Sequence, residues 1–506
     1  MGTRDRPSPF TLAPGRVGAA GIVFFALAAV APATVLTAVV PAAFTHGILF
    51  VPLVFAAVGA VLLLFVVGYA AMVRRAPHAG ALYSCVARGL GRPLGVGAGW
   101  LALACYQALQ FSVYGLVSAA AMPSLERWFG VHVPWWTVAA GCWLVVTLLG
   151  LVRVEVAGVV LGLLVLAEVA VLVGFGTANL LDPADHRVTA DTLDPTSSNG
   201  IDRPVLGLLL VVAACAFVGF ETTAAYGEEA RGPRRALARS TYLVVALTTL
   251  LYAAGSWATS VGVGPGRIAA VAADRGPELI FDLAAARLAP LAVTLGRALL
   301  LTGLLAALIS LNHTIARYLF AFGRERVLPA GLGRTAGRTS APRAASLTQS
   351  AIVAVAIGTC AGLRFDPTGW LAGRLAVAGA VGVLVLLLAT SLAALLYLNR
   401  VPNGENVGQR FAAPVLATVA LGALVYLAFR NLPALLGIPA GDRQVLIVPA
   451  AYAALLLAGV LHALALRGGR PVVYAGLGLG GTAVVVAPRV PRQRVPGAHR
   501  PERVDH

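Results

Sequence analysis

Residues 217 to 235 read FVGFETTAAYGEEARGPRR, and this stretch decides the fold that we expect for the chain. An apolar run carries Glu221 near its middle, becomes apolar again, and ends in Glu228, Glu229 and several arginines. The apolar part is long enough to cross a bilayer, yet Gly219 and Glu221 interrupt it. Irregular backbone at membrane depth persists only where something else satisfies its polar groups, often a water-filled cavity or a ligand. The stretch therefore indicates a broken transmembrane helix beside a site.

The composition of the whole chain indicates a polytopic membrane protein. Of the 506 residues, 59% are hydrophobic and only 12% are charged, with a mean hydropathy of +0.85. A soluble domain carries about a quarter charged residues. We expect no cleavable signal peptide, because residues 1–16 are polar and basic and the first apolar run is full length. The net charge of +17 does not indicate nucleic-acid binding, because the arginines fall at every second loop, as the positive-inside rule predicts.

We predict an all-α integral membrane protein with about 12 transmembrane helices. Its apolar runs have the length of roughly 18 to 25 residues that crosses the ~30 Å hydrocarbon layer. The arginine-rich loops place both termini in the cytoplasm, and the short apolar segment 472–487 is predicted to be interfacial or cytoplasmic. The tail from residue 488 onward is predicted to be disordered. The predicted spans are 18–41, 48–72, 97–121, 135–152, 156–181, 204–226, 241–263, 290–320, 345–362, 376–398, 412–429 and 445–466.

Two of these spans contain helix breakers near their middle. The first carries Pro32, and also Pro41 at its end, while the sixth carries Gly219 and Glu221. Pro32 alone could be a kink without function, because an interior proline only removes a hydrogen bond and crowds the preceding turn. Breaks at positions one and six together are typical of an inverted repeat of five helices each, with a substrate site near the midplane.

The backbone groups freed at two helix breaks suit a zwitterionic ligand. Free amides attract a carboxylate, and free carbonyls attract an ammonium group or a cation. An amino acid offers both charges. The predicted site is formed by Ala31, Pro32, Ala33, Thr34, Phe217, Val218, Gly219, Phe220 and Glu221, in which a phenylalanine either closes over the ligand or packs elsewhere.

Buried carboxyl groups are the candidates for proton coupling. Glu168 stands alone in the fifth span, and Glu221 stands at the break of the sixth. Burial favours the neutral form of a carboxyl, which makes a proton carrier near neutral pH, although a hydrogen-bonded structural glutamate is the alternative. His313, on the eighth span, is either a satisfied histidine or a relay, and Arg317 is predicted to be an ordinary anchor at the membrane face.

Glu228 and Glu229 end the sixth span on the side that is rich in arginine. Acids there oppose the positive-inside trend, so we expect them to pair with arginines of this loop or of a neighbouring one. They are either a salt-bridged latch that breaks when the inner gate opens or a solvated charge cluster. The five cysteines show no C-x-x-C spacing, so we expect no metal site, disulfide framework or cofactor.

These residues resemble the amino acid–polyamine–organocation (APC) permeases, which share the LeuT-type fold. The motifs are F-V-G-F-E at 217–221, G-E-E-A-R-G-P-R-R at 227–235, N-H-T-I-A-R-Y-L-F-A-F-G-R-E-R-V-L-P at 312–329 and H-A-G-A-L-Y at 78–83. The first span departs from the family, having A-P-A-T where many relatives have a glycine-rich break.

The resemblance implies ten core helices in two inverted halves, two peripheral helices, and transport by alternating access. It divides the chain into a cytoplasmic N-terminus (1–17), a transport core (18–398, with repeats at about 18–181 and 204–398), peripheral helices 11 and 12 (399–466) and a cytoplasmic basic tail (467–506). It adds a third-span side chain to the site, namely Tyr106, Gln107 or Gln110. Glu168 stands at or near the position of a fifth-span lysine that is proposed to replace a sodium ion in some relatives, so its carboxyl either carries a proton or helps to bind a cation.

A secondary transporter of amino acids in the cytoplasmic membrane, with a proton as the coupling partner, is the function that these features favour. A polyamine or amine permease or exchanger is the alternative, although a polyamine would need several facing acids. A channel or receptor lacks support, since no repeated filter, sensor helix or ligand domain is present. An enzyme is not indicated either, because no catalytic motif or P-loop appears.

Overall fold

The computed structural model describes residues 10–75, 77–197, 202–232, 234–336 and 340–480. Within these residues, eleven helices are long and apolar enough to cross a membrane, and Trp135–Leu151 is a shorter apolar helix of 17 residues. The prediction of an all-α protein with about twelve spans is confirmed. The predicted tail from residue 488 onward lies outside the described residues, as do residues 481–487 of the segment 472–487.

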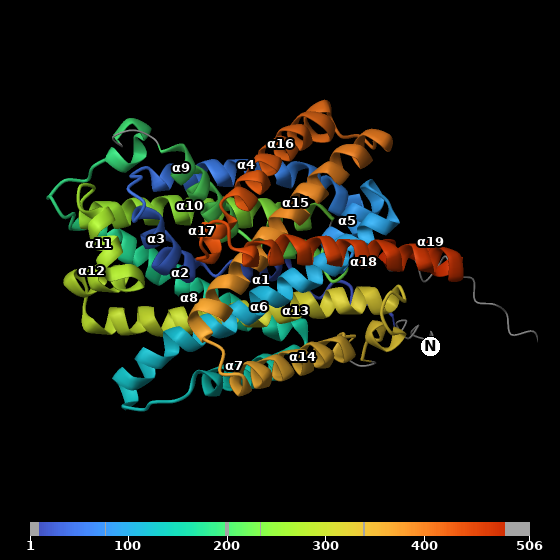
Figure 1. The fold of residues 1–506 in the computed structure, drawn as a ribbon, viewed down its shortest axis with the longest axis horizontal. Coiled ribbons are helices and arrows are strands. Elements are labelled where there is room, and N and C mark those ends of the chain that lie inside the picture. The colour runs from blue at the N-terminus through green and yellow to red at the C-terminus, as the bar shows by residue number, and fades with distance from the viewer. Residues whose placement is uncertain (1–9, 76, 198–201, 233, 337–339, 481–506) are drawn as a thin grey trace, which may run out of the picture.

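The spans follow one another along the chain and several contain more than one helical segment (Figure 1). The first is α1 (Ala19–Val30), α2 (Pro32–Thr34), η1 (Val35–Val39) and α3 (Val40–Phe44), and the sixth is α9 (Arg203–Ala216) with η4 (Phe220–Tyr226). The others are α4 (Val51–Arg75), α6 (Arg92–Phe129), α7 (Trp135–Leu151), α8 (Val154–Leu181), α10 (Arg234–Val263), α13 (Pro290–Arg324), α14 (Arg343–Gly362), η7 (Pro367–Arg374) with α15 (Leu375–Arg400), η8 (Gly408–Ala412) with α16 (Ala413–Arg430), and η9 (Arg443–Leu446) with α18 (Ile447–Gly469).

Several helices extend beyond the predicted apolar runs. The third span was predicted at 97–121 and is a helix over Arg92–Phe129, and the tenth was predicted at 376–398 and begins at Pro367. Hydropathy detects only the segment that lies in hydrocarbon. The backbone hydrogen bonds of a helix continue past it, so charged residues and prolines at the ends do not stop the helix.

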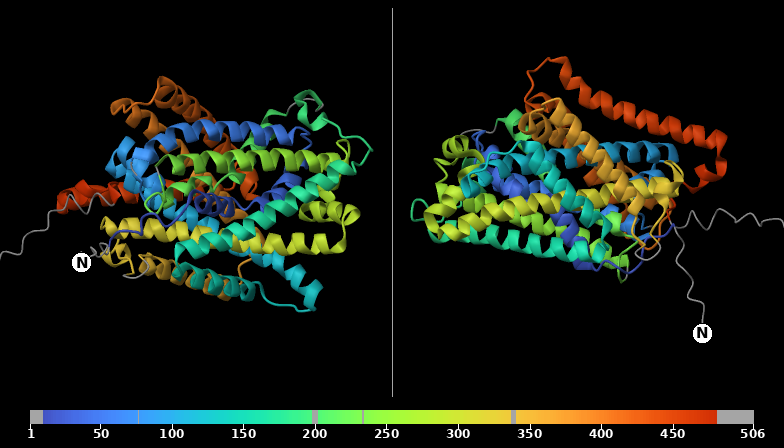
Figure 2. Two further views of the ribbon diagram at one scale, coloured as in Figure 1. Left: turned by 180° about the vertical axis from the view of Figure 1, so that it is seen from behind. Right: turned by 90° about the horizontal axis from the view of Figure 1, so that it is seen from below.

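The two ends of the bundle differ in their loops. The N-terminal end of the described chain, α5 (Ala81–Gly89) and α19 (Pro471–Gly476) lie together at one end, and α11 (Ile268–Arg275) and α12 (Leu279–Arg287) lie at the other (Figures 1 and 2). We call the first end, where Arg88 and Arg400 lie, the arginine-rich face. Contacts tie its loops to one another, since Arg88 donates to the carbonyl oxygen of Gly478 at 3.2 Å and Arg400 donates to that of Gly89 at 3.1 Å.

Small residues let the helices approach closely. A Cβ atom on Gly459 of α18 would lie 2.5 Å from the Cα atom of Gly97 on α6. A Cβ atom on Gly115 would lie 2.6 Å from the carbonyl oxygen of Pro367. Lipid offers no hydrophobic drive for helices to associate, so close van der Waals contact between small residues supplies much of the packing energy. These contacts hold α6 at the centre of the bundle, between α18 and the tenth span.

Candidate functional site

The first span breaks at Ala31. This residue has φ 52° and ψ 66°, a left-handed conformation that is uncommon for a residue other than glycine, and it ends α1. Pro32 follows as the first residue of α2, where its missing N–H costs nothing. The π-helical segment η1 ends at Val39, two residues before Pro41, and its wider turn accommodates a proline within the span.

The sixth span breaks at Gly219. Helix α9 ends at Ala216, Gly219 has φ 122°, and the chain continues as the 3₁₀ segment η4. A Cβ atom on Gly219 would lie 2.8 Å from the carbonyl carbon of Ala29 and 2.8 Å from the nitrogen of Val30. Only glycine fits both this conformation and this contact. The two breaks therefore touch, and the structure brings together the segments that the sequence singled out.

Glu221 folds back onto the break of its own span. Its Oε2 atom accepts a hydrogen bond from the backbone N–H of Gly219 at 2.9 Å, and its Oε1 atom accepts one from the Tyr106 hydroxyl at 2.8 Å. The Tyr69 hydroxyl donates to the Glu221 carbonyl oxygen at 2.9 Å. The Glu221 residue is fully buried. Tyr69 was not predicted, because nothing in its own apolar helix distinguishes it from a packing residue.

Glu168 reaches the other break. It projects from α8, and its Oε1 atom accepts a hydrogen bond from the backbone N–H of Ala33 at 2.6 Å. Ala33 belongs to α2, so Glu168 caps the N-terminus of the second half of the first span. A cavity of about 10 Å³ beside Glu168, Thr37 and Phe281 has room for about one water molecule. Glu168 is only 2% exposed, so it is a buried carboxyl in contact with the helix break.

Each break thus has one of its amides occupied by a carboxyl group of the protein itself. Ala33 donates to Glu168, and Gly219 donates to Glu221. A ligand carboxylate that used either amide would have to displace the resident carboxyl. Neutralising that carboxyl weakens its hold on the amide, because hydrogen bonds to a charged acceptor are about twice as strong as neutral ones. The arrangement can therefore connect proton binding to ligand binding.

The remaining predicted residues divide into two groups. Phe217 and Phe220 are fully buried next to the break, with their rings against Tyr252 and Phe65 at centroid distances of 5.2 and 5.9 Å. Pro32 and Val218 are buried, and Ala31 and Thr34 are partly exposed. Gln107 makes its hydrogen bond with another element and not with a residue of the two breaks. It donates to Gln349 of α14 at 3.0 Å, and Gln110 accepts from the same Gln349 at 2.6 Å.

Glu228 lies in a cluster of ion pairs at the arginine-rich face. Arg324 donates to both of its carboxylate oxygens at 2.7 Å, and the backbone N–H of Ala79 donates at 3.0 Å. Burial acts to raise the pKa of Glu228, but the hydrogen bonds and charge of Arg324, with His78, outweigh it and hold the pKa below its ordinary value. Glu228 therefore stays ionised, and it joins the end of the sixth span to the end of the eighth.

Glu229 makes the second ion pair of this cluster. Its Oε2 atom accepts from Arg317 at 2.7 Å and 2.6 Å, and its carbonyl oxygen accepts from the N–H groups of Arg16 and Val17 at 2.9 Å. Burial raises the pKa of Glu229, against the opposing effect of Arg317. The prediction that Arg317 is an ordinary anchor is wrong, because this residue is 1% exposed and lies over the Tyr226 ring at 4.1 Å.

Glu325 forms a second cluster, which the sequence did not reveal. His78 lies 2.8 Å from its Oε1 atom, and the backbone N–H groups of Gly478 and Gly480 donate to its two oxygens at 2.9 Å. Burial raises the pKa of Glu325, but His78, Tyr83 and the Gly478 amide outweigh it and hold the pKa below its ordinary value. The cluster fastens the segment after α19 beneath the loop that precedes the third span.

The sequence of the chain matches the family model described as "Amino acid permease" over residues 21–434. The chain belongs to this amino acid permease family. The permease is 28% identical over 356 residues to an uncharacterized transporter of Mycobacterium tuberculosis, covering 68% of this chain and 74% of that protein. It is also 28% identical over 308 residues to the branched-chain amino acid permease BcaP of Lactococcus lactis, covering 57% of this chain and 64% of that protein.

Solved structures of transporters share the fold of the permease. A mutant form of a manganese transporter of Eremococcus coleocola matches with a TM-score of 0.55 at 13% identity, over 90% of this chain and 97% of that chain. A Na⁺-coupled sialic acid symporter in its substrate-bound outward-open state matches with a TM-score of 0.55 at 12% identity, over 85% and 93%. These likenesses confirm the predicted LeuT-type fold, and the family confirms that the chain is a transporter and not an enzyme.

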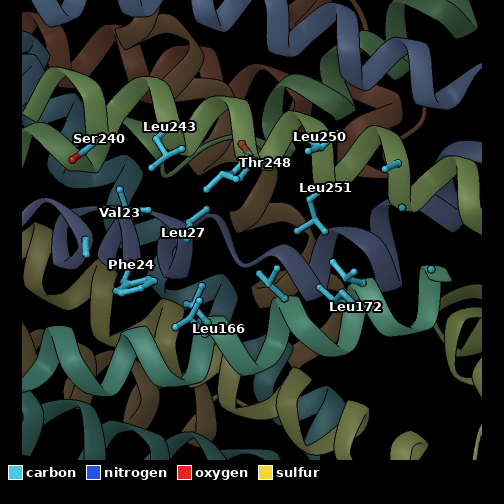
Figure 3. A pocket seen from close by; sticks show the side chains of 18 of the residues that line it. Val23, Phe24, Leu27, Leu166, Leu172, Ser240, Leu243, Thr248, Leu250 and Leu251 are labelled. Atoms are coloured by element: carbon cyan, nitrogen blue, oxygen red, sulfur yellow. The ribbon is translucent and has the colours of Figure 1, made fainter. Parts of the chain in front are cut away.

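The permease also has a large apolar groove that lies apart from the two breaks. Side chains from α1, α8 and α10 project into it, among them Phe24, Leu172 and Leu251 (Figure 3). Its volume is about 840 Å³, and neither Glu168 nor Glu221 lines it. Leu166 and Leu250 on its walls are exposed, as residues that face acyl chains would be. Apart from Arg239 and a few hydroxyl groups, its lining is apolar, so the groove suits hydrocarbon.

Proposed function

We propose that this permease moves amino acids across the cytoplasmic membrane by alternating access, with a proton as the coupling ion. The contact of the two helix breaks, each with a buried carboxyl on one of its amides, is the observation that carries the proposal. Membership of the amino acid permease family and the similarity to a branched-chain amino acid permease support an amino acid as the substrate. The positive-inside rule supports a cytoplasmic location for the arginine-rich face and for both termini.

The proposed substrate site lies at the meeting of the first and sixth spans. The residues at Ala31–Thr34 and Phe217–Glu221 line it, together with Tyr106. The substrate carboxylate competes with Glu168 for the N–H group of Ala33, and the substrate ammonium faces carbonyl oxygens at the end of α1. In this arrangement the core comprises residues 18–398 as two inverted repeats, and residues 399–466 form the peripheral helices.

Competition at the Ala33 amide explains proton coupling. Ionised Glu168 holds this amide by a charge-assisted hydrogen bond and also repels an incoming carboxylate. Once a proton neutralises Glu168, the bond weakens and the repulsion disappears, so the substrate gains the amide. Proton binding and substrate binding then favour each other reciprocally, as linkage requires. Release of the proton on the cytoplasmic side restores the bond to Ala33 and expels the substrate.

Glu228 and Glu229 are proposed as the latch of the inner gate. Both acids follow the broken sixth span directly, and their partners Arg324 and Arg317 lie on the eighth. The loop they stand on also holds the residues just before α1, since Arg231 donates its N–H to the Val17 carbonyl at 2.7 Å. Opening toward the arginine-rich face requires these contacts to part, because the helices that they join flank the two breaks.

Thermal stabilisation of the purified permease by the twenty amino acids, at pH 5.5 and pH 8, tests this function. A ligand that binds only the folded state raises the melting temperature by mass action. We expect a chemically related group of amino acids to stabilise the protein, more strongly at the lower pH. Stabilisation by polyamines alone would instead favour a polyamine or amine permease. A polyamine would have to compete for two carboxyls that already accept hydrogen bonds from backbone amides.

A further inference from the structure

A second cavity lies at the arginine-rich face, where four spans end. Its volume is about 380 Å³, within the range of ligand pockets of ~300–1,000 Å³. The end of α4 contributes Arg74 and Arg75, the beginning of α10 contributes Arg235, and the loop before η8 contributes Asn403 and Glu405. None of these residues belongs to the helix breaks or to the ion-pair clusters around Glu228, Glu229 and Glu325.

The charges around this cavity do not balance. Arg75 is paired with Glu405, which also accepts the N–H group of Asn403 at 3.0 Å. Their side chains are 11% and 8% exposed, so this pair is a fixed part of the wall. Within the residues that the structure describes, Arg74 and Arg235 line the same cavity and make no side-chain hydrogen bond or ion pair. Arg74 and Arg235 therefore add two positive charges that Glu405, which is paired with Arg75, does not neutralise.

The depth of the cavity in the membrane narrows the choice of anion. The spans Val51–Arg75, Arg235–Val263, Pro367–Arg400 and Gly408–Arg430 all begin or end beside it. The ends of spans lie at the level of the lipid headgroups. Arginine binds phosphate oxygens with two parallel hydrogen bonds, and basic pockets between transmembrane helices suit anionic headgroups.

We propose that this cavity is a binding site for a phosphate group, supplied by the headgroup of an anionic phospholipid. Arg74 and Arg235 bind the phosphodiester oxygens, and the amide of Asn403 is available to the polar end of the headgroup. A bound headgroup would join the end of the second span to the beginning of the seventh. It would thereby fasten these spans to the loop between the tenth and eleventh, which Arg75 and Glu405 already hold.

The test is a titration of melting temperature in a neutral detergent with short-chain phosphatidylglycerol. Short-chain phosphatidylcholine controls for the acyl chains, and inorganic phosphate controls for the free anion. The test variant is Arg74→Gln with Arg235→Gln. The matched control is Arg343→Gln, because Arg343 is an exposed arginine that also begins a helix at the arginine-rich face. About tenfold in affinity corresponds to 1.4 kcal/mol, so two arginines at ~1 kcal/mol each predict a loss of about 30-fold.

We expect phosphatidylglycerol to raise the melting temperature of the wild type and of Arg343→Gln equally, and phosphatidylcholine to have no such effect. The double variant should melt at the wild-type temperature without lipid and bind phosphatidylglycerol about 30-fold more weakly. Stabilisation by inorganic phosphate with the same dependence on the two arginines would support the phosphate site but assign it to a soluble anion. Equal responses of the double variant and the wild type to phosphatidylglycerol, or no response of the wild type to either probe, would overturn the proposal.

Discussion

Glu168→Gln is the substitution that examines the proposed coupling most closely. In the wild type, Oε1 of Glu168 accepts a hydrogen bond from the Ala33 N–H group at 2.6 Å. Glutamine keeps an oxygen that can accept this bond, and it has the size and the neutrality of the protonated acid. It removes only the ability to ionise. The variant should therefore fold and bind substrate as the wild type does at low pH.

The structure sets the size of the effect. A hydrogen bond from an amide to a charged group contributes ~1.5–3 kcal/mol, and one to a neutral group contributes ~0.5–1.5 kcal/mol. The difference of about 1 to 1.5 kcal/mol is the additional cost of displacing ionised Glu168 from Ala33. It corresponds to a weakening of substrate binding by about five- to tenfold as Glu168 loses its proton. Repulsion between the two carboxylates adds to this value.

Substrate affinity measured from pH 5 to pH 9 by thermal stabilisation supplies the assay. The wild type should bind more weakly as pH rises through the titration of Glu168, and Glu168→Gln should bind equally at every pH. Glu126→Gln is a suitable control, because Glu126 is an exposed acid at the end of α6. A variant whose affinity follows pH as steeply as the wild type would refute the role of Glu168.

Three further substitutions probe the breaks and the clusters at the arginine-rich face. Gly219→Leu should abolish substrate binding measured by calorimetry, because a Cβ atom there would lie 2.8 Å from the backbone at Ala29 and Val30; unchanged affinity would place the site elsewhere. Glu228→Gln leaves the buried Arg324 charge without its partner, a change that costs about 3–5 kcal/mol, so maleimide labelling of the buried Cys85 should accelerate; an unchanged rate would argue against a latch. Glu325 has a lowered pKa in the folded state, so its contribution to stability is present above the ordinary value of 4.5 and is lost as pH falls through the lower folded value. Glu325→Gln should therefore reduce the fall of melting temperature at acidic pH. An unchanged fall would contradict the assignment.

Much of the fold could be predicted because its signals are local. An apolar run of about 20 residues identifies a span wherever it lies in the chain. Pro32 and Gly219 carry the information for the two breaks in their own backbone chemistry, and the structure has breaks at Ala31 and Gly219. The ends of the helices were less accurate, because hydropathy measures the hydrocarbon segment and not the hydrogen-bonded helix.

The partners of the polar side chains could not be predicted, because they lie far apart in the chain. Ala33 and Glu168 are separated by 135 residues, and Tyr106 and Glu221 by 115. The sequence indicated that each acid was unusual for its depth, but only packing decides which amide or hydroxyl it meets. The same limit explains Gln107, which the resemblance to the APC permeases added to the site and whose hydrogen bond is made to Gln349.

Transport itself is the most direct measurement of the central claim. Proteoliposomes that contain the permease would be given an inward proton gradient and an external mixture of the twenty amino acids, and mass spectrometry would measure the contents of the lumen. We predict that a chemically related subset accumulates above its external concentration, and that a protonophore collapses the accumulation. Lumen contents equal to those of protein-free liposomes, with the permease demonstrably folded, would contradict the assignment as a proton-coupled amino acid transporter.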